Sequence, residues 1–155
     1  MTVKFVLILP NIRSAHNVGA IFRTADGAGV DKIYLTGYTP RPPHPRLDKV
    51  SLGAEKSVPW EGVAQAGRLV KKLKFEGYKI VALEQTKNSV NIYKWTPVFP
   101  LALIVGNEKT GVSKSLLNLC DTAVELPMLG KKKSLNVSVA VGVAMYQVTN
   151  HKSKI

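Results

Sequence analysis

The sequence predicts an α/β domain built on a mostly parallel β-sheet that is flanked by helices. Apolar, β-branched runs are typical of strands buried on both faces, and helix-spaced segments separate these runs along the chain. The length of 155 residues is that of one domain, which can bury its own core without cross-links. We therefore expect a single domain over residues 1–155.

Strand and helix signals alternate at the start of the chain. Residues 3–9 form a continuous apolar run, which predicts a strand. A helical stretch follows from about residue 15 to residue 29, with Ser14 or Asn11 as its N-cap and glycines at its end. The run 32–36 is typical of a second strand.

A proline-rich segment comes next. Residues 39–46 contain four prolines, which fix φ and remove backbone donors, so we expect a stiff loop without regular structure. The loop presents Arg41, His44 and Arg46. It is either a rigid connector or a ligand contact, and the residues alone do not separate these two interpretations.

The same patterns predict the elements of the middle of the chain. They are a helix over 63–75, strands over 78–83, 101–105 and 122–126, and a short helix over 112–119. The outer face of the first of these helices is basic, with Arg68, Lys71, Lys72 and Lys74.

Residues 135–148 carry two conflicting signals. Valines alternate with small residues over 137–143, which favours a strand, whereas the length and the small residues also permit a closely packed helix. The residue pattern leans towards the strand. As a helix, the segment would be apolar around its whole circumference and would need two partners, the sheet and a second copy of the chain. We therefore expect a homodimer.

The charge balance points to a polyanionic partner. Lys and Arg number 22 against 10 Asp and Glu, a formal net charge of +12 with a pI near 9.9. The alternative is a surface excess of cations that serves solubility. On charge alone, nucleic acid is the favoured partner.

Several classes of protein are excluded by what the sequence lacks. The single cysteine, Cys120, permits no intrachain disulfide, and the three histidines show no zinc-binding spacing, so we expect no metal. No apolar run reaches the roughly 18 residues of a membrane span, and the apolar start is too short for a signal peptide. We expect a cytoplasmic protein that does not bind membranes.

The segment 106–113 has the spacing of a phosphate-binding P-loop between a strand and a helix. Val112 stands where the P-loop lysine is required, so the sequence disfavours nucleotide hydrolysis. Its two glycines are sufficient for a tight strand-to-helix turn. Glu108 in this turn would nevertheless lie at the carboxyl end of a strand, where parallel sheets bind ligands.

Two further groups of polar residues could carry chemistry. Arg23 lies among apolar residues of the first helix, close to the face of Asn17, and a buried arginine needs an anion. That anion is either Glu108, in a salt bridge, or a phosphate or substrate. The lysines of 131–133 precede Ser134 and Asn136 at the start of an element, and they form either a solvated surface or a contact for RNA phosphates.

Together these stretches resemble the three motifs of the SpoU class (TrmH-like) of SPOUT RNA methyltransferases. The first motif is Asn17, Arg23 and Thr24; the second is Gly106, Glu108 and Gly111; the third is Pro127, Met128, Gly130 and Ser134–Ser138. The similarity covers about residues 3–149, and all three motifs occur in order.

The resemblance implies a sheet whose C-terminal part forms a deep trefoil knot, although knots are nearly absent from proteins. It also makes 135–148 a helix, and we prefer this to the strand because the motif match is more specific. It implies that the knot binds S-adenosylmethionine, largely through backbone groups, with S-adenosylhomocysteine as the product. The cofactor-binding residues by motif position are Leu83, Glu84, Gln85, Gly106, Leu126, Met128, Ser134 and Leu135.

The activity implied by the resemblance is methyl transfer to a ribose 2′-hydroxyl of RNA, without a metal. Arg23 would act at the reacting oxygen, either as a base or as a cation that stabilises the oxyanion or a phosphate. Asn17, Glu108, Ser134 and Asn136 would orient Arg23, the ribose and the cofactor.

The chain is similar to the minimal family members, in which no RNA-binding domain is attached and several of which modify the anticodon wobble ribose. We expect tRNA as the substrate, because a single domain suits an exposed loop whose bases can be splayed out. The alternatives are ribosomal RNA and a non-catalytic RNA-binding protein. The predicted RNA-binding residues are Arg41, His44, Arg46, Lys131, Lys132 and Lys133.

Overall fold

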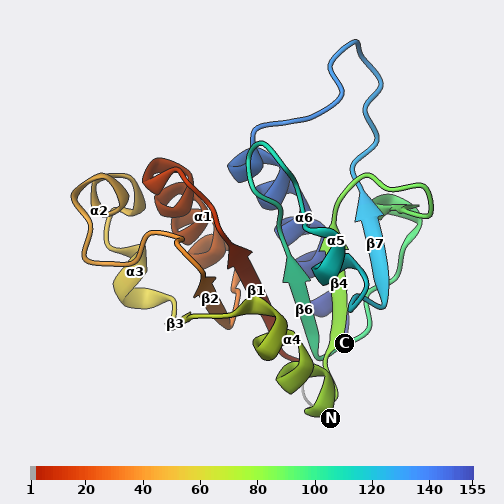
Figure 1. Ribbon diagram of the computed structural model, residues 1–155, viewed down its shortest axis with the longest axis horizontal. Helices are drawn as coiled ribbons and strands as arrows, with labels where there is room; N and C mark the ends of the chain where they lie inside the picture. Colours follow the sequence, from red (N-terminus) through yellow and green to blue (C-terminus); the bar gives the residue numbers. More distant parts are fainter. Residues whose placement is uncertain (1–2) are drawn as a thin grey trace.

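The computed structural model describes residues 3–155, which form one seven-stranded sheet with the order β3-β2-β1-β6-β4-β7-β5 (Figure 1). The strands are β1 Phe5–Pro10, β2 Lys32–Thr36, β3 Trp60–Val63, β4 Lys79–Leu83, β5 Val90–Asn91, β6 Leu101–Ile104 and β7 Thr122–Glu125. Every pair of neighbouring strands is parallel. The predicted α/β class with a mostly parallel sheet is confirmed.

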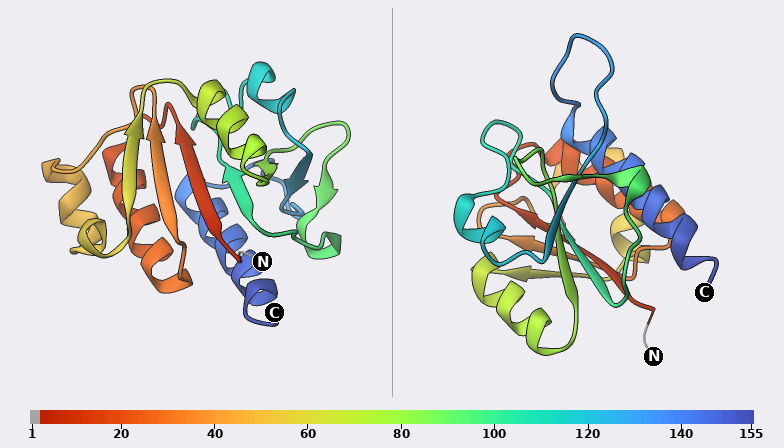
Figure 2. Two further views of the ribbon diagram at one scale, coloured as in Figure 1. Left: turned by 90° about the horizontal axis from the view of Figure 1, so that it is seen from below. Right: turned by 90° about the vertical axis from the view of Figure 1, so that its right-hand side faces the viewer.

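Helices cover both faces of the sheet (Figure 2). They are α1 Ala15–Ala28, α2 Pro45–Ser51, α3 Ala54–Ser57, α4 Ala66–Phe75, α5 Lys114–Leu117 and α6 Val137–Lys152, with a 3₁₀ turn η1 at Ile92–Lys94. Strand β1 shows how the two layers are separated. Leu7 and Leu9 are buried with α1 and α6, whereas Val6 and Ile8 are buried with α4 and α5. Both faces of this central strand are therefore core, as its continuous apolar run predicts.

Helix α1 has the predicted ends. The Ser14 side chain accepts from the backbone N–H of Asn17, and Gly29 closes the helix in the left-handed conformation at φ 72°. Within the helix, a Cβ on Gly19 would lie 2.5 Å from the carbonyl oxygen of Leu47 in α2. Helices α1 and α2 can pack this closely only because residue 19 has no side chain.

Segment 137–152 is helix α6, so the strand favoured by its alternating valines is wrong and the helix implied by the resemblance is confirmed. Its buried residues are Val141, Ala144, Met145 and Val148, which recur at helical spacing. The alternation arises because the opposite side of the helix is also apolar, with Val139 and Val143 exposed.

Helix α6 returns to the side of α1. Thr149 Oγ1 donates to the carbonyl of Ala28 at 2.7 Å, and Lys152 Nζ pairs with Asp31 at 2.7 Å. The two helices approach closely where Gly142 faces the methyl group of Thr24. The deep trefoil knot implied by the resemblance stays a prediction.

The region 39–63 is more regular than its sequence predicts. Helix α2 starts at Pro45, inside the segment expected to be irregular, because proline fits the first turn of a helix and the His44 side chain provides the N-cap. Strand β3 was not predicted, because the charged Glu61 and the side-chain-free Gly62 interrupt the apolar pattern that is typical of a strand. It occupies Trp60–Val63, so the helix predicted over 63–75 begins only at Ala66.

Candidate functional site

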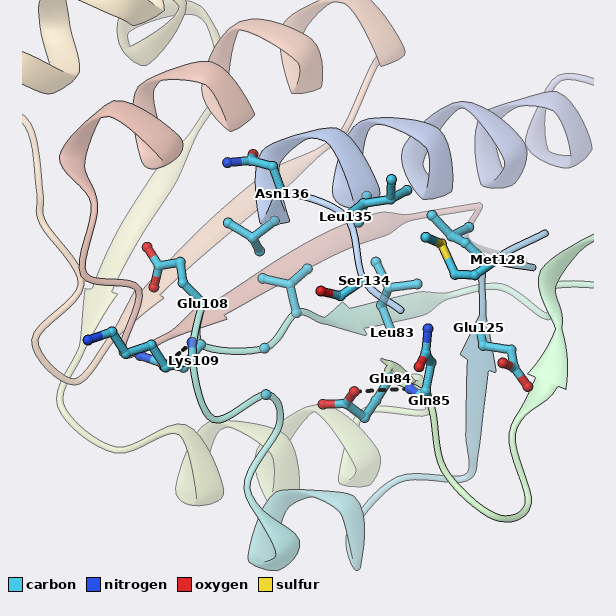
Figure 3. Close-up of a pocket in the computed structure, with 17 residues that line it drawn as sticks. Leu83, Glu84, Gln85, Glu108, Lys109, Glu125, Met128, Ser134, Leu135 and Asn136 are labelled. Atoms are coloured by element: carbon cyan, nitrogen blue, oxygen red, sulfur yellow. Dashed lines mark hydrogen bonds between the residues drawn. The ribbon is translucent and has the colours of Figure 1, made fainter. Parts of the chain in front are cut away.

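A pocket of about 410 Å³ opens at the carboxyl ends of β4, β6 and β7, next to the start of α6 (Figure 3). This size is within the range of small-molecule and cofactor sites. Its walls come from segments far apart in the sequence. The lining residues are Leu83, Glu84, Gln85, Val105, Gly106, Asn107, Glu108, Lys109, Gly111, Glu125, Leu126, Met128, Ser134, Leu135, Asn136, Val137 and Ala140.

All of the residues predicted to bind a cofactor lie in this pocket. They are Leu83, Glu84, Gln85, Gly106, Leu126, Met128, Ser134 and Leu135. Three of the residues predicted to be catalytic, Glu108, Ser134 and Asn136, also line it. Asn17 is linked to the pocket through Glu108, whereas Arg23 does not line it.

The turn after β6 forms one wall and depends on its glycines. Asn107 and Gly111 exchange backbone hydrogen bonds of 3.1 and 3.0 Å, which fold the segment back on itself. A Cβ on Gly106 would lie 2.7 Å from the backbone of Gly111. The backbone N–H of Val112 donates to the Glu84 carboxylate at 2.8 Å. In a P-loop, the backbone N–H groups of the corresponding turn point at a bound phosphate. A carboxylate in this position is a further argument against nucleotide hydrolysis.

Glu108 ties the same turn to the start of α1. Its carboxylate accepts from the backbone N–H groups of Arg13 at 3.0 Å and Ser14 at 2.9 Å, and from Asn17 Nδ2 at 3.3 Å. Burial opposes the charge, but these hydrogen bonds outweigh it and lower the pKa of Glu108. A carboxylate at the N-terminal end of a helix is also favoured by the helix dipole. Glu108 therefore anchors α1 to the pocket.

Arg23 is exposed, although its apolar neighbours in the sequence suggest that it is buried. Ile21 and Phe22 are buried, but Arg23 lies on the exposed side of α1. A salt bridge with Glu108, one of the two alternatives for the anion partner of Arg23, is absent, and within residues 3–155 the Arg23 guanidinium forms no ion pair. The error has a simple cause: adjacent helix positions point about 100° apart, so apolar neighbours in sequence do not make a residue buried.

The loop between β7 and α6 forms the opposite wall. Gln85 Nε2 donates to the carbonyl of Lys133 at 2.7 Å and holds the end of the loop over the pocket. Asn136 is the N-cap of α6, because its Oδ1 accepts from the backbone N–H of Ser138 at 2.9 Å. Residues 131–133 are exposed lysines on this loop.

The predicted RNA-contact residues of the proline-rich segment lie on the α2 side of the sheet (Figure 1). His44 Nδ1 accepts from the backbone N–H of Arg46 at 3.2 Å, so this imidazole has a structural role as the cap of α2. The Arg41 guanidinium lies against the backbone of Gly62 in β3, where a side chain on residue 62 would collide with it. The Arg41 and Arg46 side chains are both exposed.

Sequence reasoning missed Asn107, which connects three loops. Its Nδ2 donates to the carbonyl of Asn11 at 2.7 Å and to the hydroxyl of Tyr38 at 3.1 Å. Its Oδ1 accepts from the backbone N–H groups of Lys109 and Thr110. The available signal was a short amide side chain inside a glycine-bounded turn, where such side chains bond to nearby backbone.

The amino-acid sequence matches the SpoU rRNA Methylase family over residues 4–146. The chain belongs to the SpoU methylase family. The resemblance drawn from the three motifs is thereby confirmed, and the match covers all seven strands and the first part of α6.

Named SpoU relatives come from several bacteria. A tRNA (guanosine(18)-2′-O)-methyltransferase of Aquifex aeolicus is 33% identical over 96% of this chain and 70% of its own length. The 23S rRNA (guanosine-2′-O-)-methyltransferase RlmB of Pseudomonas putida is 32% identical over 97% of this chain and 60% of its own. This chain thus spans about 60% of the length of several curated relatives.

Solved SpoU structures share the fold. The AdoMet-bound rRNA methyltransferase from Sinorhizobium meliloti superposes with a TM-score of 0.90 and 26% identity, over 97% of this chain and 57% of that one.

The described residues hold no group of three or more His, Cys, Asp or Glu side chains that could bind a metal ion. Within the same residues, none of the helices has both the length and the apolar character to cross a bilayer. The cytoplasmic location stays a prediction.

Proposed function

We propose that this protein transfers a methyl group from S-adenosylmethionine to a ribose 2′-hydroxyl of RNA. The observation that carries the proposal is the pocket, which is lined by residues of the second and third motifs. Glu108, in the wall of the pocket, binds the start of α1, the helix that contains the first motif. Two relatives named for this reaction are identical to the chain at about a third of the aligned positions.

The pocket suits the cofactor chemically. The side chains of Leu83, Leu126 and Ala140 provide an apolar surface for an adenine ring, and the turn after β6 brings backbone groups to the same cavity. The carboxylates of Glu84 and Glu125 line the pocket and match a cationic ligand. When bound, S-adenosylmethionine supplies an electrophilic methyl group and leaves as neutral S-adenosylhomocysteine.

The chain's own residues hold and polarise the ribose. The 2′-oxygen bonds to the methyl carbon as the carbon–sulfur bond breaks, and its proton passes to solvent water; a positioned cation stabilises the negative charge that develops on the oxygen. Arg23 is suited to this role because arginine stays protonated in proteins. Ser134 and Asn136 line the pocket and offer a hydroxyl and an amide for orienting the ribose.

A homodimer brings Arg23 to the reaction. Arg23 does not line the pocket of its own chain, so we propose that it serves the pocket of a second copy. The exposed side of α6 presents Val139, Val143 and Tyr146, an apolar stripe at helical spacing, and the exposed Leu135 precedes the helix. The stripe continues onto the exposed side of α1, because the Tyr146 hydroxyl lies against Gly27. Arg23 is therefore beside the surface that a second copy would cover.

Within RNA, we propose tRNA as the substrate. The formal net charge of +12 provides affinity for phosphates, and the exposed cations Arg41, Arg46 and 131–133 are our candidate contacts. The wobble nucleotide of the anticodon loop, which is single-stranded, is the first position to test.

The test uses the purified chain with labelled S-adenosylmethionine and either total tRNA or ribosomal RNA, followed by mass mapping of the methylated nucleotide. Label on a 2′-oxygen in the tRNA fraction is the expected result. Label on a base would contradict the reaction, and label only in ribosomal RNA would contradict the substrate. Calorimetry with S-adenosylmethionine and with ATP separates a methyltransferase, which binds only the first, from a nucleotide hydrolase. RNA binding without transfer would favour the non-catalytic alternative.

A further inference from the structure

An exposed tyrosine is held in one position beside the pocket. Tyr38 follows β2, and 61% of its surface is exposed. Its backbone N–H donates to Asn11 Oδ1 at 3.1 Å, and its hydroxyl accepts from Asn107 Nδ2 at 3.1 Å. Asn107 itself lines the pocket. The ring of Tyr38 is therefore fixed at both ends while its surface stays open to solvent.

The backbone on both sides of this ring adopts conformations that need special residues. Asn11 and Gly37 have φ of 53° and 60°, in the left-handed region. A Cβ on Gly37 would collide with the Asn11 side chain. Such conformations persist where contacts with the surrounding structure stabilise them, and they are frequent at binding sites. Here they hold the Tyr38 ring in an exposed position.

Two cationic residues belong to the loops that meet at Asn107 and Glu108. The backbone N–H of Lys109 donates to Asn107, the residue that binds the Tyr38 hydroxyl, and the backbone N–H of Arg13 donates to Glu108, the residue next to Asn107 in the chain. The Arg13 and Lys109 side chains are exposed, and among residues 3–155 they form no ion pairs. Figure 3 shows the Lys109 side chain directed away from the cavity. An open aromatic ring together with unpaired cations on the loops that hold it is typical of surfaces that bind single-stranded nucleic acid.

We propose that Tyr38 is the stacking surface for a base of the substrate RNA, at or next to the methylated nucleotide. The inference rests on the proposed function for the identity of the ligand. The ring supplies the face on which the base stacks, and Arg13 and Lys109 bind the neighbouring phosphates. Since the Tyr38 hydroxyl is occupied by Asn107, recognition depends on the ring, and the hydroxyl only fixes its orientation.

The variant Tyr38→Ala tests the ring, and Tyr93→Ala is its matched control. Tyr93 is 59% exposed in η1 and is absent from the pocket lining. We expect Tyr38→Ala to weaken binding to total tRNA about tenfold to a hundredfold, the usual range for losing one base–aromatic stack. Tyr93→Ala should bind like the wild type. Tyr38→Phe keeps the ring and should lose less than Tyr38→Ala.

Calorimetry with S-adenosylmethionine shows whether the effect is a general disturbance of the pocket. Affinity for the cofactor and the melting temperature should be unchanged in Tyr38→Ala. Equal RNA binding by Tyr38→Ala and Tyr93→Ala would overturn the inference, as would a parallel loss of cofactor affinity. A wild-type protein that binds tRNA but transfers no methyl group would contradict the proposed function alone, because the comparison of RNA binding would still decide the role of Tyr38.

A second measurement identifies the stacked base. Once the methylated position is mapped, RNAs are made with an abasic nucleotide at that position or at either neighbour. For the RNA that lacks the stacked base, Tyr38→Ala and the wild type should bind with equal affinity, because the Tyr38 ring has no base to stack on in either case. A loss of affinity in Tyr38→Ala that persists in all three abasic RNAs would exclude base stacking by Tyr38.

Discussion

Arg23 is an exposed cation on α1 whose only proposed role is in catalysis. Replacing it with alanine removes the charge that we propose stabilises the developing oxyanion, so we expect turnover to fall about a hundredfold to a thousandfold. Affinity for S-adenosylmethionine, measured by calorimetry, should stay as in the wild type because Arg23 does not line the pocket. Arg68→Ala, at an exposed arginine of α4, is the control for loss of charge. An Arg23→Ala enzyme with more than about a tenth of normal turnover would remove this residue from the mechanism.

Glu108 gives stability a dependence on pH. Its pKa is lowered from the ordinary 4.5, so its contribution is present above pH 4.5 and is lost as pH falls through the lower pKa of the folded state. Glu108→Gln keeps the shape but loses the charge at the start of α1. For this exposed carboxylate we expect a loss of about 1 kcal/mol at pH 7, or about 2–4 °C in melting temperature. The difference between the two proteins should shrink as the pH falls below 4.5, and a constant difference would contradict this role.

Among the helices, two glycines should respond in opposite ways to alanine. At Gly19 the new Cβ would lie 2.5 Å from a carbonyl oxygen of α2, so α1 and α2 must separate, and we expect a loss of about 1–3 kcal/mol. At Gly67 in α4 nothing lies within 4 Å, and alanine is the better helix former, so we expect a gain of about 0.5–1 kcal/mol. Urea unfolding of both variants measures these values. A loss at Gly67 or a gain at Gly19 would contradict the packing described here.

The accuracy of the sequence predictions differs between elements for physical reasons. The run 32–36 and the ends of α1 were predictable because strand patterning and caps are local signals. The residue pattern of α6 predicted a strand wrongly because both sides of this helix are apolar, one packed against the sheet and one exposed. Strand β3 was hidden because its formation depends on pairing with β2, which no local pattern reveals.

The same distinction applies to the site. The motifs identified the residues that line the pocket, because a family pattern carries information about distant segments. The residue types alone did not show that Glu108 would bind backbone groups of Arg13 and Ser14, which lie more than 90 positions away. They also did not place Tyr38 beside Asn107, since both depend on how the loops after β2 and β6 meet.

At the scale of the whole molecule, the proposed dimer can be tested by complementation. Arg23→Ala leaves the pocket intact, and Ala140→Leu places extra volume in the pocket but keeps Arg23. Each variant alone should be inactive. Coexpressed in equal amounts, they should regain about a quarter of the normal sites, since half of the dimers are mixed and each mixed dimer has one complete site. No recovery in mixed dimers would show that Arg23 acts within its own chain.

Assembly itself depends on the stripe of α6. Val139→Lys places a charge in that stripe at an exposed position, so the fold should persist while association is lost. Sedimentation at micromolar concentration should show a dimer for the wild type and a monomer for the variant. A monomeric wild type would contradict the dimer directly.

The position of α6 also has a consequence during protein synthesis. The residues that close the pocket, from Leu126 to Ala140, are translated after every strand of the sheet. A nascent chain can pair β1 with β2 early, because domains fold from the N-terminal side as they emerge from the ribosome. The site proposed for the cofactor is complete only after the final helix has docked beside α1. Binding of S-adenosylmethionine at this proposed site would thus distinguish fully folded protein from incomplete chains.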